Sequence, residues 1–343
     1  MRRLSCGLSV LLLHVASTPA AGQAGQLPDG DRVRLAEAIR LADGLSEQLW
    51  PAWGSTPFPV LLVSDSAEFL IGHSNPSADF APLGHDLLLG RAVWTRPRRF
   101  SPTLLATFPA VGGVPTVVIG SAERTGRSST GWVLTVLHEH FHQWQYTRPG
   151  YYPGVASLNL ANGDTTGQWM LDYPFPYDSG AVQQRMRRLA FALARALGAP
   201  SAGRDKAVQD VIRARELIRA GLKAEDYRYF EFQLWQEGVA RFIEYAAARA
   251  AGRLQEPAPA FRSLADYESY GKVAGTVRRR LGRELEYLDL KRQRRTAFYS
   301  IGAAMALLLE ETRSDWKAAY AQHPFALAAL LGALRQTPVK REE

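Results

Sequence analysis

Residues 137–144 read LHEHFHQW and contain the pattern His-Glu-x-x-His. On a helix, residues four positions apart lie on one face, so His138 and His142 can direct their imidazole rings at one metal ion. Glu139 lies one position further round the helix. It can therefore reach a water molecule beside that ion without being a ligand, as a general base requires. The pattern predicts a metal-binding helix, and the alternative is a polar helix face that carries clustered histidines.

The other histidines do not extend this pattern. His140 points to the opposite side of the predicted helix from His138, which favours a packed or surface side chain. The remaining four have no partner at a spacing typical of metal ligands: His14, His73, His85 and His323.

A catalytic zinc ion needs three protein ligands and one open position. Residues 234–245 read LWQEGVARFIEY and place Glu237 on an apolar helical stretch next to small residues. Small residues let the helix approach another helix closely and bury the carboxylate, whose charge a metal ion would then neutralise. Glu231 and Glu244 are competing candidates, and a glutamate on the surface is the alternative for Glu237.

The two segments resemble the zinc-binding segments of the M1-type gluzincin aminopeptidases. The resemblance implies one Zn²⁺ ion, held by His138, His142 and Glu237, with Glu139 as the general base. It also implies a zincin-like fold and a peptide or protein substrate.

A third segment, YSIGA at Tyr299–Ala303, is similar to the family's Tyr-x-Lys-Gly-Ala. In that family the tyrosine donates a hydrogen bond to the oxyanion of the tetrahedral intermediate, so the resemblance implies this role for Tyr299. The alternative is a buried tyrosine at the start of a helix.

Three departures from the family pattern narrow the expected activity. Ile301 replaces the family's lysine, and a much longer stretch separates His142 from Glu237. The segment Val111–Pro115 lacks the acid with which the family binds a substrate's amino terminus. The sequence therefore favours hydrolysis of a peptide or related amide bond, but not specifically an aminopeptidase.

The first 24 residues predict export. Arg2 and Arg3 precede an apolar run from Leu8 to Ala16, and small residues continue to Ala24. This order is typical of a secretory signal peptide, and the apolar run is too short for a membrane-spanning helix. We therefore expect a periplasmic or extracellular protein with no integral membrane span in its mature chain.

Composition and charge exclude several classes of protein. The chain of 343 residues is 46% hydrophobic and 22% charged, which is typical of a soluble globular protein. Cys6 is the only cysteine, so the predicted mature chain offers no thiolate ligand or cysteine nucleophile. Much of the formal charge of +8 comes from Arg278–Arg295, where acids are interleaved with the arginines. That mixture favours a solvated helix face over a nucleic-acid surface, so we expect no nucleic-acid partner.

Hydrophobic periodicity predicts an α+β protein, with a small N-terminal β-sheet and an active-site helix packed on a largely helical C-terminal half. The predicted organisation is a signal peptide at 1–24, an N-terminal α/β subdomain at 25–130 and a helical catalytic subdomain at 131–335. The latter carries a long insertion at 148–226. The predicted helices are Asp29–Leu49, Leu134–Tyr146, Ala181–Leu197, Lys206–Ala220, Tyr227–Ala251 and Thr296–Glu311. The predicted strands are Pro59–Val63, Asp86–Val93 and Val114–Ile119, the last as an edge strand able to pair with a peptide.

A long loop is expected at Arg148–Gly180, where proline, glycine and aromatic residues are frequent. Asp172, Tyr173 and Tyr177 could contact a substrate, whereas an aromatic minicore that holds the loop down is the alternative.

The sequence as a whole predicts an exported zinc-dependent metallohydrolase, most simply a peptidase. The alternatives are a non-catalytic cell-envelope binding protein on the same scaffold and a metal-dependent hydrolase of a non-peptide substrate.

Overall fold

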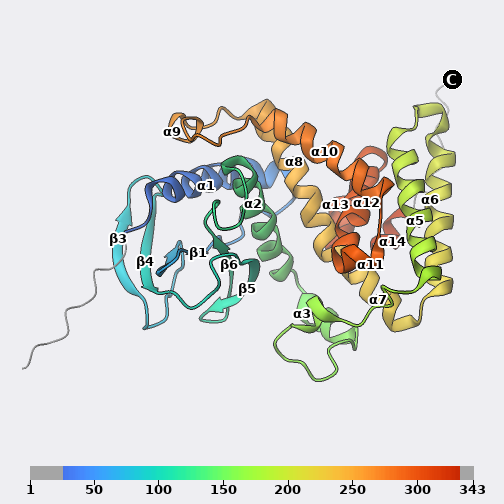
Figure 1. The fold of residues 1–343 in the computed structure, drawn as a ribbon, viewed down its shortest axis with the longest axis horizontal. Coiled ribbons are helices and arrows are strands. Elements are labelled where there is room, and N and C mark those ends of the chain that lie inside the picture. Colours follow the sequence, from blue (N-terminus) through green and yellow to red (C-terminus); the bar gives the residue numbers. More distant parts are fainter. Residues whose placement is uncertain (1–25, 333–343) are drawn as a thin grey trace, which may run out of the picture.

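The computed structural model describes residues 26–332 and shows a mixed α+β protein. A six-stranded sheet and helix α1 (Asp29–Leu49) form one end of the molecule, and a larger helical body forms the other (Figure 1). Helix α2 (Ser129–Tyr146) lies between the two. The predicted signal peptide, Cys6, His14 and the last three residues of the predicted catalytic subdomain lie outside the described residues.

The sheet has the strand order β3-β4-β2-β1-β6-β5. β1 and β6 are parallel and the other neighbours are antiparallel. Side chains alternate between its two faces. Val60 and Leu62 join the main core beneath α1 and α2, whereas Leu61 and Val63 join a smaller apolar cluster on the other face. The strand bounds are β1 Val60–Val63, β2 Ala67–Ile71, β3 Ala81–Asp86, β4 Arg91–Pro97, β5 Leu105–Val111 and β6 Val114–Gly120.

Two of the three predicted strands are confirmed as β1 and β6, but the strand predicted at Asp86–Val93 was wrong. Its first half is the turn between β3 and β4. The Asp86 carboxylate accepts hydrogen bonds from the N–H groups of Leu88 and Leu89 at 2.9 and 3.0 Å, and Gly90 has a φ of +63°. The hydrogen bonds to the Asp86 side chain favour a turn at this point, although the leucines that follow form an apolar run typical of a strand.

The expected edge strand is also in a different place. β6 lies between β1 and β5, so both of its sides are hydrogen-bonded. The edge beside α2 is β5, which the sequence did not predict as a strand.

Helix α1 has the predicted bounds, and α2 begins five residues before the predicted start at Leu134. The Ser128 side chain accepts a hydrogen bond from the N–H of Gly131 and so caps α2. The indole of Trp132 donates to the carbonyl of Gly120 at the end of β6, at 2.7 Å. α2 is buried on nearly all sides, as expected for a helix between a sheet and a helical body.

The helical body contains the other predicted helices and several that the sequence did not delimit, of which α10 (Tyr270–Glu286) is the longest; it overlaps the charged stretch for which a solvated helix face was expected. The predicted helix Tyr227–Ala251 forms three consecutive segments: α7 (Ala224–Gln233), a π-helical turn η1 (Leu234–Gly238) and α8 (Val239–Leu254). The remaining bounds are α3 Tyr151–Ser157, α4 Trp169–Asp172, α5 Gly180–Gly198, α6 Ser201–Gly221, α9 Pro259–Arg262, α11 Leu290–Gln293, η2 Arg294–Thr296, α12 Ala297–Thr312, α13 Trp316–Gln322 and α14 Leu327–Gly332. Between residues 26 and 332, no helix is both long enough and apolar enough to cross a membrane.

The segment 148–180 is mostly loop with two short helices, and its aromatic residues form a packed minicore. Tyr173 stacks on Tyr229 with ring centroids 4.3 Å apart, and its hydroxyl donates to Asp226 at 2.9 Å. Tyr177 is likewise buried, whereas Asp172 is exposed. The packing alternative therefore accounts for both tyrosines.

Candidate metal centre

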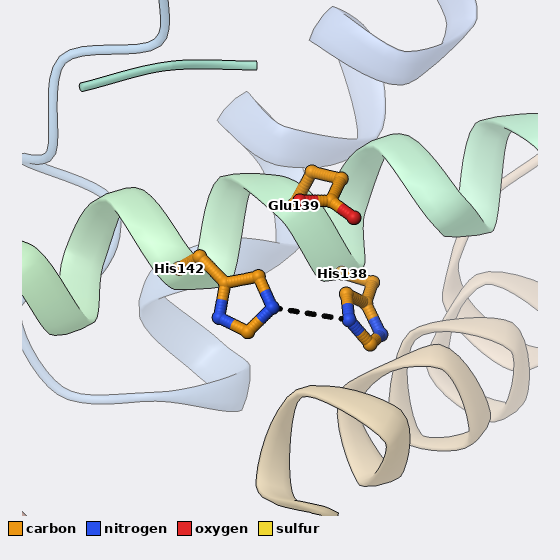
Figure 2. Close-up of side chains that lie close together, drawn as sticks. All are labelled: His138, Glu139 and His142. Atoms are coloured by element: carbon orange, nitrogen blue, oxygen red, sulfur yellow. Dashed lines mark hydrogen bonds between the residues drawn. The ribbon is translucent and has the colours of Figure 1, made fainter. Parts of the chain in front are cut away.

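The side chains of His138, Glu139 and His142 project from the middle of α2 and are buried (Figure 2). One potential ligand atom from each residue lies within 4.8 Å of the others, so the group could hold a metal ion. The two imidazoles face one another, with the Nε2 atoms 3.2 Å apart, as the four-residue spacing predicts.

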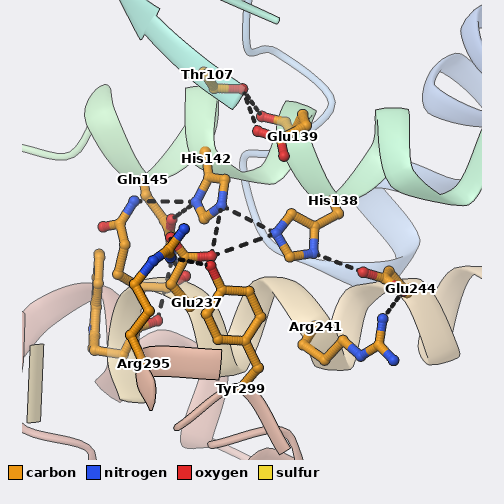
Figure 3. Close-up of polar contacts among 12 residues, drawn as sticks. Thr107, His138, Glu139, His142, Gln145, Glu237, Arg241, Glu244, Arg295 and Tyr299 are labelled. Carbon is orange, nitrogen blue, oxygen red and sulfur yellow. Dashed lines mark hydrogen bonds and ion pairs between the residues drawn. The ribbon is translucent and has the colours of Figure 1, made fainter. Parts of the chain in front are cut away.

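Glu237 enters the same site from the π-helical turn η1, which packs alongside α2 (Figure 3). Its Oε2 atom lies 3.7 Å from His138 Nε2 and 3.5 Å from His142 Nε2. Ligands at about 2.0–2.2 Å from a tetrahedral ion would be separated by roughly 3.3–3.6 Å, and the three distances here, 3.2, 3.5 and 3.7 Å, lie within about 0.1 Å of that range. The two histidines and Glu237 are therefore spaced as three ligands of one metal ion would be.

The two competing glutamates lie elsewhere. Glu244 accepts a hydrogen bond from Nδ1 of His138 at 2.9 Å and is held by Arg241 Nη1 at 2.6 Å. It thus orients the imidazole from the side away from the ligand atoms, as carboxylates beside metal-bound histidines do. Glu231 forms a buried ion pair with Arg215.

His142 is oriented by an amide. Its Nδ1 donates to Gln145 Oε1 at 2.6 Å. The amide nitrogen of Gln145 donates to the carbonyls of Trp235 and Gln236 and to the Tyr320 hydroxyl, at 3.2, 3.0 and 2.7 Å. Because these three acceptors fix the nitrogen, the amide oxygen must face His142. The Gln236 amide nitrogen also lies 3.1 Å from Nδ1, so both side-chain amides orient the ring through Nδ1 and leave Nε2 facing the site.

The close approach of η1 to helix α12 depends on two glycines. A Cβ atom on Gly238 would lie 2.4 Å from Gly302 Cα, and one on Gly302 would lie 2.6 Å from Gly238 Cα. Neither distance accommodates a side chain. The small residue after Glu237 therefore permits the helix contact expected from the sequence, and the contacting helix is the one that carries Tyr299.

Glu139 is oriented by the edge strand β5. Thr107 Oγ1 donates to Glu139 Oε2 at 2.9 Å and lies at the same distance from the Glu139 carbonyl. One carboxylate oxygen is thereby fixed, and the other can interact with a water molecule or substrate.

Tyr299 lies in the first turn of α12 and faces the two histidines and Glu237 (Figure 3). Its ring lies 6.5 Å from that of His138, centroid to centroid, and its hydroxyl accepts a hydrogen bond from Arg295 Nη1 at 2.5 Å. Burial and the nearby Glu237 carboxylate raise the pKa of Tyr299 well above its usual value. The hydroxyl therefore keeps its proton and can act as a hydrogen-bond donor.

The charges at the site favour a bound cation. Burial by itself would lower the pKa of His138, but hydrogen bonds to Glu237 and Glu244 raise it to about 10. Burial opposes ionisation of Glu237, yet His142 and His138 hold the pKa of its carboxyl well below the usual range. Two buried carboxylates thus require a positive charge between them, which a proton or a metal ion can provide.

The other histidines lie outside the site, in agreement with the sequence prediction for those within the described residues. His140 stacks on Phe58 with ring centroids 4.0 Å apart and hydrogen-bonds to Gln143 at 2.8 Å. Burial lowers the pKa of His140 to about 3, so the ring is neutral. His73 is buried 3.3 Å from the carbonyl of Val111, and His85 is exposed on β3.

Sequence reasoning missed Thr107, Gln145 and Arg295. The contact of Gln145 with His142 could have been predicted, since Gln145 follows His142 by three positions and so lies on the same helix face. Thr107 and Arg295 approach from distant segments and have no local signal. Comparisons with models of protein families, with curated proteins and with solved structures find no match for this chain.

Proposed function

We propose that the protein is an exported zinc-dependent hydrolase of the gluzincin type, with a zincin-like fold, that cleaves peptide bonds. The observation that carries the proposal is the triangle of His138 Nε2, His142 Nε2 and Glu237 Oε2, with sides of 3.2–3.7 Å, beside the free carboxylate oxygen of Glu139. A binding protein would have no need of a buried general base beside three converging ligand atoms.

Each residue then has one task. A zinc ion in this triangle would polarise a substrate carbonyl and lower the pKa of water. Glu139, oriented by Thr107, accepts the proton of the attacking water and passes it to the leaving amine as the C–N bond breaks. Tyr299 donates its hydroxyl proton in a hydrogen bond to the carbonyl oxygen as that oxygen becomes negative.

Strand β5 offers a place for an extended peptide. It is an edge strand, and Thr107 on this strand contacts Glu139. The edge is covered at Thr107, whose carbonyl accepts a hydrogen bond from the Tyr146 hydroxyl at 3.1 Å, so an extended peptide could pair only with other residues of β5.

Export is part of the proposal and is supported by the sequence pattern of residues 1–24. Cleavage of that segment in the producing cell, detected by mass spectrometry of the amino terminus, tests it.

The activity is tested on the mature protein by measuring bound zinc and the cleavage of a peptide library. We expect one zinc ion per chain, its loss in Glu237→Ala, and a fall in kcat of about 10²- to 10⁴-fold in Glu139→Gln with zinc retained. His140→Phe is the matched control, because it preserves the stacking on Phe58 and should keep both zinc and activity. Stoichiometric zinc without any Glu139-dependent cleavage would refute the peptidase and favour a binding protein.

A further inference from the structure

Side-chain exposure around the metal centre is uneven. The side chains of His142 and His138 are 6% and 7% exposed, that of Glu237 is 16% exposed and that of Arg295 is 28% exposed. Exposure thus rises from the histidines through Glu237 to Arg295. A substrate that approaches from the Glu237 side therefore passes the Arg295 guanidinium.

Arg295 has unused hydrogen-bonding capacity. Of its five N–H groups, the contact to the Tyr299 hydroxyl at 2.5 Å occupies one. Within residues 26–332, the carboxylate nearest to it is Glu237, whose Oε1 is 4.0 Å from Nη1. By contrast, Arg241 on the opposite side of the site is held by Glu244 at 2.6 Å. If Glu237 binds a cation, no other carboxylate of the described residues lies within 4.0 Å of the Arg295 guanidinium to balance its charge.

The backbone before Arg295 is strained. Arg294 has φ +51° and ψ −135°, a conformation that residues with a side chain rarely adopt. The side chain of Arg294 lies over the ring of Tyr177 and pairs with Asp178 at 3.3 Å, whereas that of Arg295 points into the site. Strain of this kind persists where the surrounding structure enforces it, and here it places one arginine at the metal centre.

Distance limits what Arg295 can bind. The guanidinium is one hydrogen bond from the Tyr299 hydroxyl, which in the proposed reaction is one hydrogen bond from the reacting carbonyl oxygen. Two such bonds place the guanidinium about 5 Å from that oxygen. Since one residue of extended chain spans about 3.3–3.6 Å, a carboxylate on the residue next to the scissile bond lies within reach.

We propose that Arg295 binds the free carboxylate at the carboxyl terminus of the substrate, which would make the protein a carboxypeptidase that removes one residue at a time. This inference rests on the proposed peptidase activity. The pairing of a guanidinium with a terminal carboxylate is charge-assisted and can be bidentate, and it is well suited to a partly desolvated site.

The test compares matched peptides that end in a free carboxylate or in an amide. We expect the wild-type protein to favour the free acid by about 10- to 100-fold in kcat/KM, mainly through a lower KM. In Arg295→Gln this preference should fall below about threefold, and Arg295→Lys should keep part of it because the charge remains. Arg204→Gln is the control, since Arg204 on α6 has the same 28% exposure but pairs with Glu311 and makes no contact with the metal-centre residues.

A binding measurement separates this inference from the peptidase proposal. Calorimetry on zinc-loaded Glu139→Gln should show tighter binding of the acid than of the amide, and adding Arg295→Gln should remove the difference. Equal cleavage and equal binding of the two peptides would overturn the role of Arg295 and leave the peptidase intact. Selective binding of the acid without Glu139-dependent cleavage would overturn the peptidase and keep the carboxylate site. If the protein shows neither acid-selective binding nor Glu139-dependent cleavage, both the carboxylate site and the peptidase activity are refuted.

Discussion

Adding one methyl group at Gly302 should weaken the metal centre without changing any of its ligands. In Gly302→Ala the new Cβ would lie 2.6 Å from Gly238 Cα and 2.7 Å from the carbonyl oxygen of Leu234. Carbon atoms in contact prefer about 3.5–4.0 Å, so α12 and η1 must separate by roughly 1 Å. Glu237 precedes Gly238 and moves with it.

The size of the effect follows from this displacement. Metal-ligand distances tolerate about 0.2 Å, so a carboxylate displaced by roughly 1 Å should cost about 10- to 100-fold in zinc affinity. Overpacking should also lower the free energy of unfolding of the zinc-free protein by about 1–3 kcal/mol. Replacing glycine in a helix would otherwise stabilise it by up to about 1 kcal/mol, so the two effects have opposite signs.

The assay is urea unfolding of the zinc-free protein together with zinc titration against a chelator of known affinity. Gly282→Ala is the control: a Cβ atom added at Gly282, on α10, would meet no neighbouring side chain or element within 4 Å, so this variant should gain stability and keep its zinc affinity. If Gly302→Ala binds zinc as tightly as the wild type, the close contact between η1 and α12 does not set the position of Glu237.

Two further predictions concern charged contacts. Glu244→Ala should weaken zinc binding by about 10- to 100-fold without abolishing it, because His138 keeps its Nε2 but loses its orienting carboxylate. Competition with a chelator measures the change. Complete loss of zinc would instead show that Glu244 is a ligand. In the turn before β3, hydrogen bonds from Ser77 and Arg96 lower the pKa of Asp79 to about 2, below the value near 3.8 of the unfolded chain. Its stabilisation is therefore present above about pH 4 and is lost as the pH falls toward 2. Urea unfolding should show wild type and Asp79→Asn converging in stability over that range, and a constant difference would contradict the assignment.

The sequence predicted those parts of the site that depend on local spacing. Four-residue spacing on α2 placed the two histidines on one face, and the small residue after Glu237 predicted a close helix contact. Burial of the minicore tyrosines also followed from composition, because aromatic residues in a long loop need a surface to pack on.

The rest of the site depends on contacts between distant segments, for which the sequence has no local signal. Thr107 reaches Glu139 only because β5 is the edge strand beside α2, and the strand order cannot be read from a single strand. Arg295 lies in a charged stretch that resembles any solvated helix face. The π-helical form of η1 also could not be predicted, since its residues favour an ordinary α-helix.

The hydrogen bond between Gln145 and Tyr320 joins the metal centre to a helix near the carboxyl-terminal end of the described residues. As the chain emerges from its amino terminus, it presents His138 and His142 long before Glu237, and Tyr320 on α13 later still. Two histidines alone form an incomplete zinc site. If the centre binds zinc as proposed, full affinity would require the carboxyl-terminal helices to be docked, and metal uptake would then report a late step of folding.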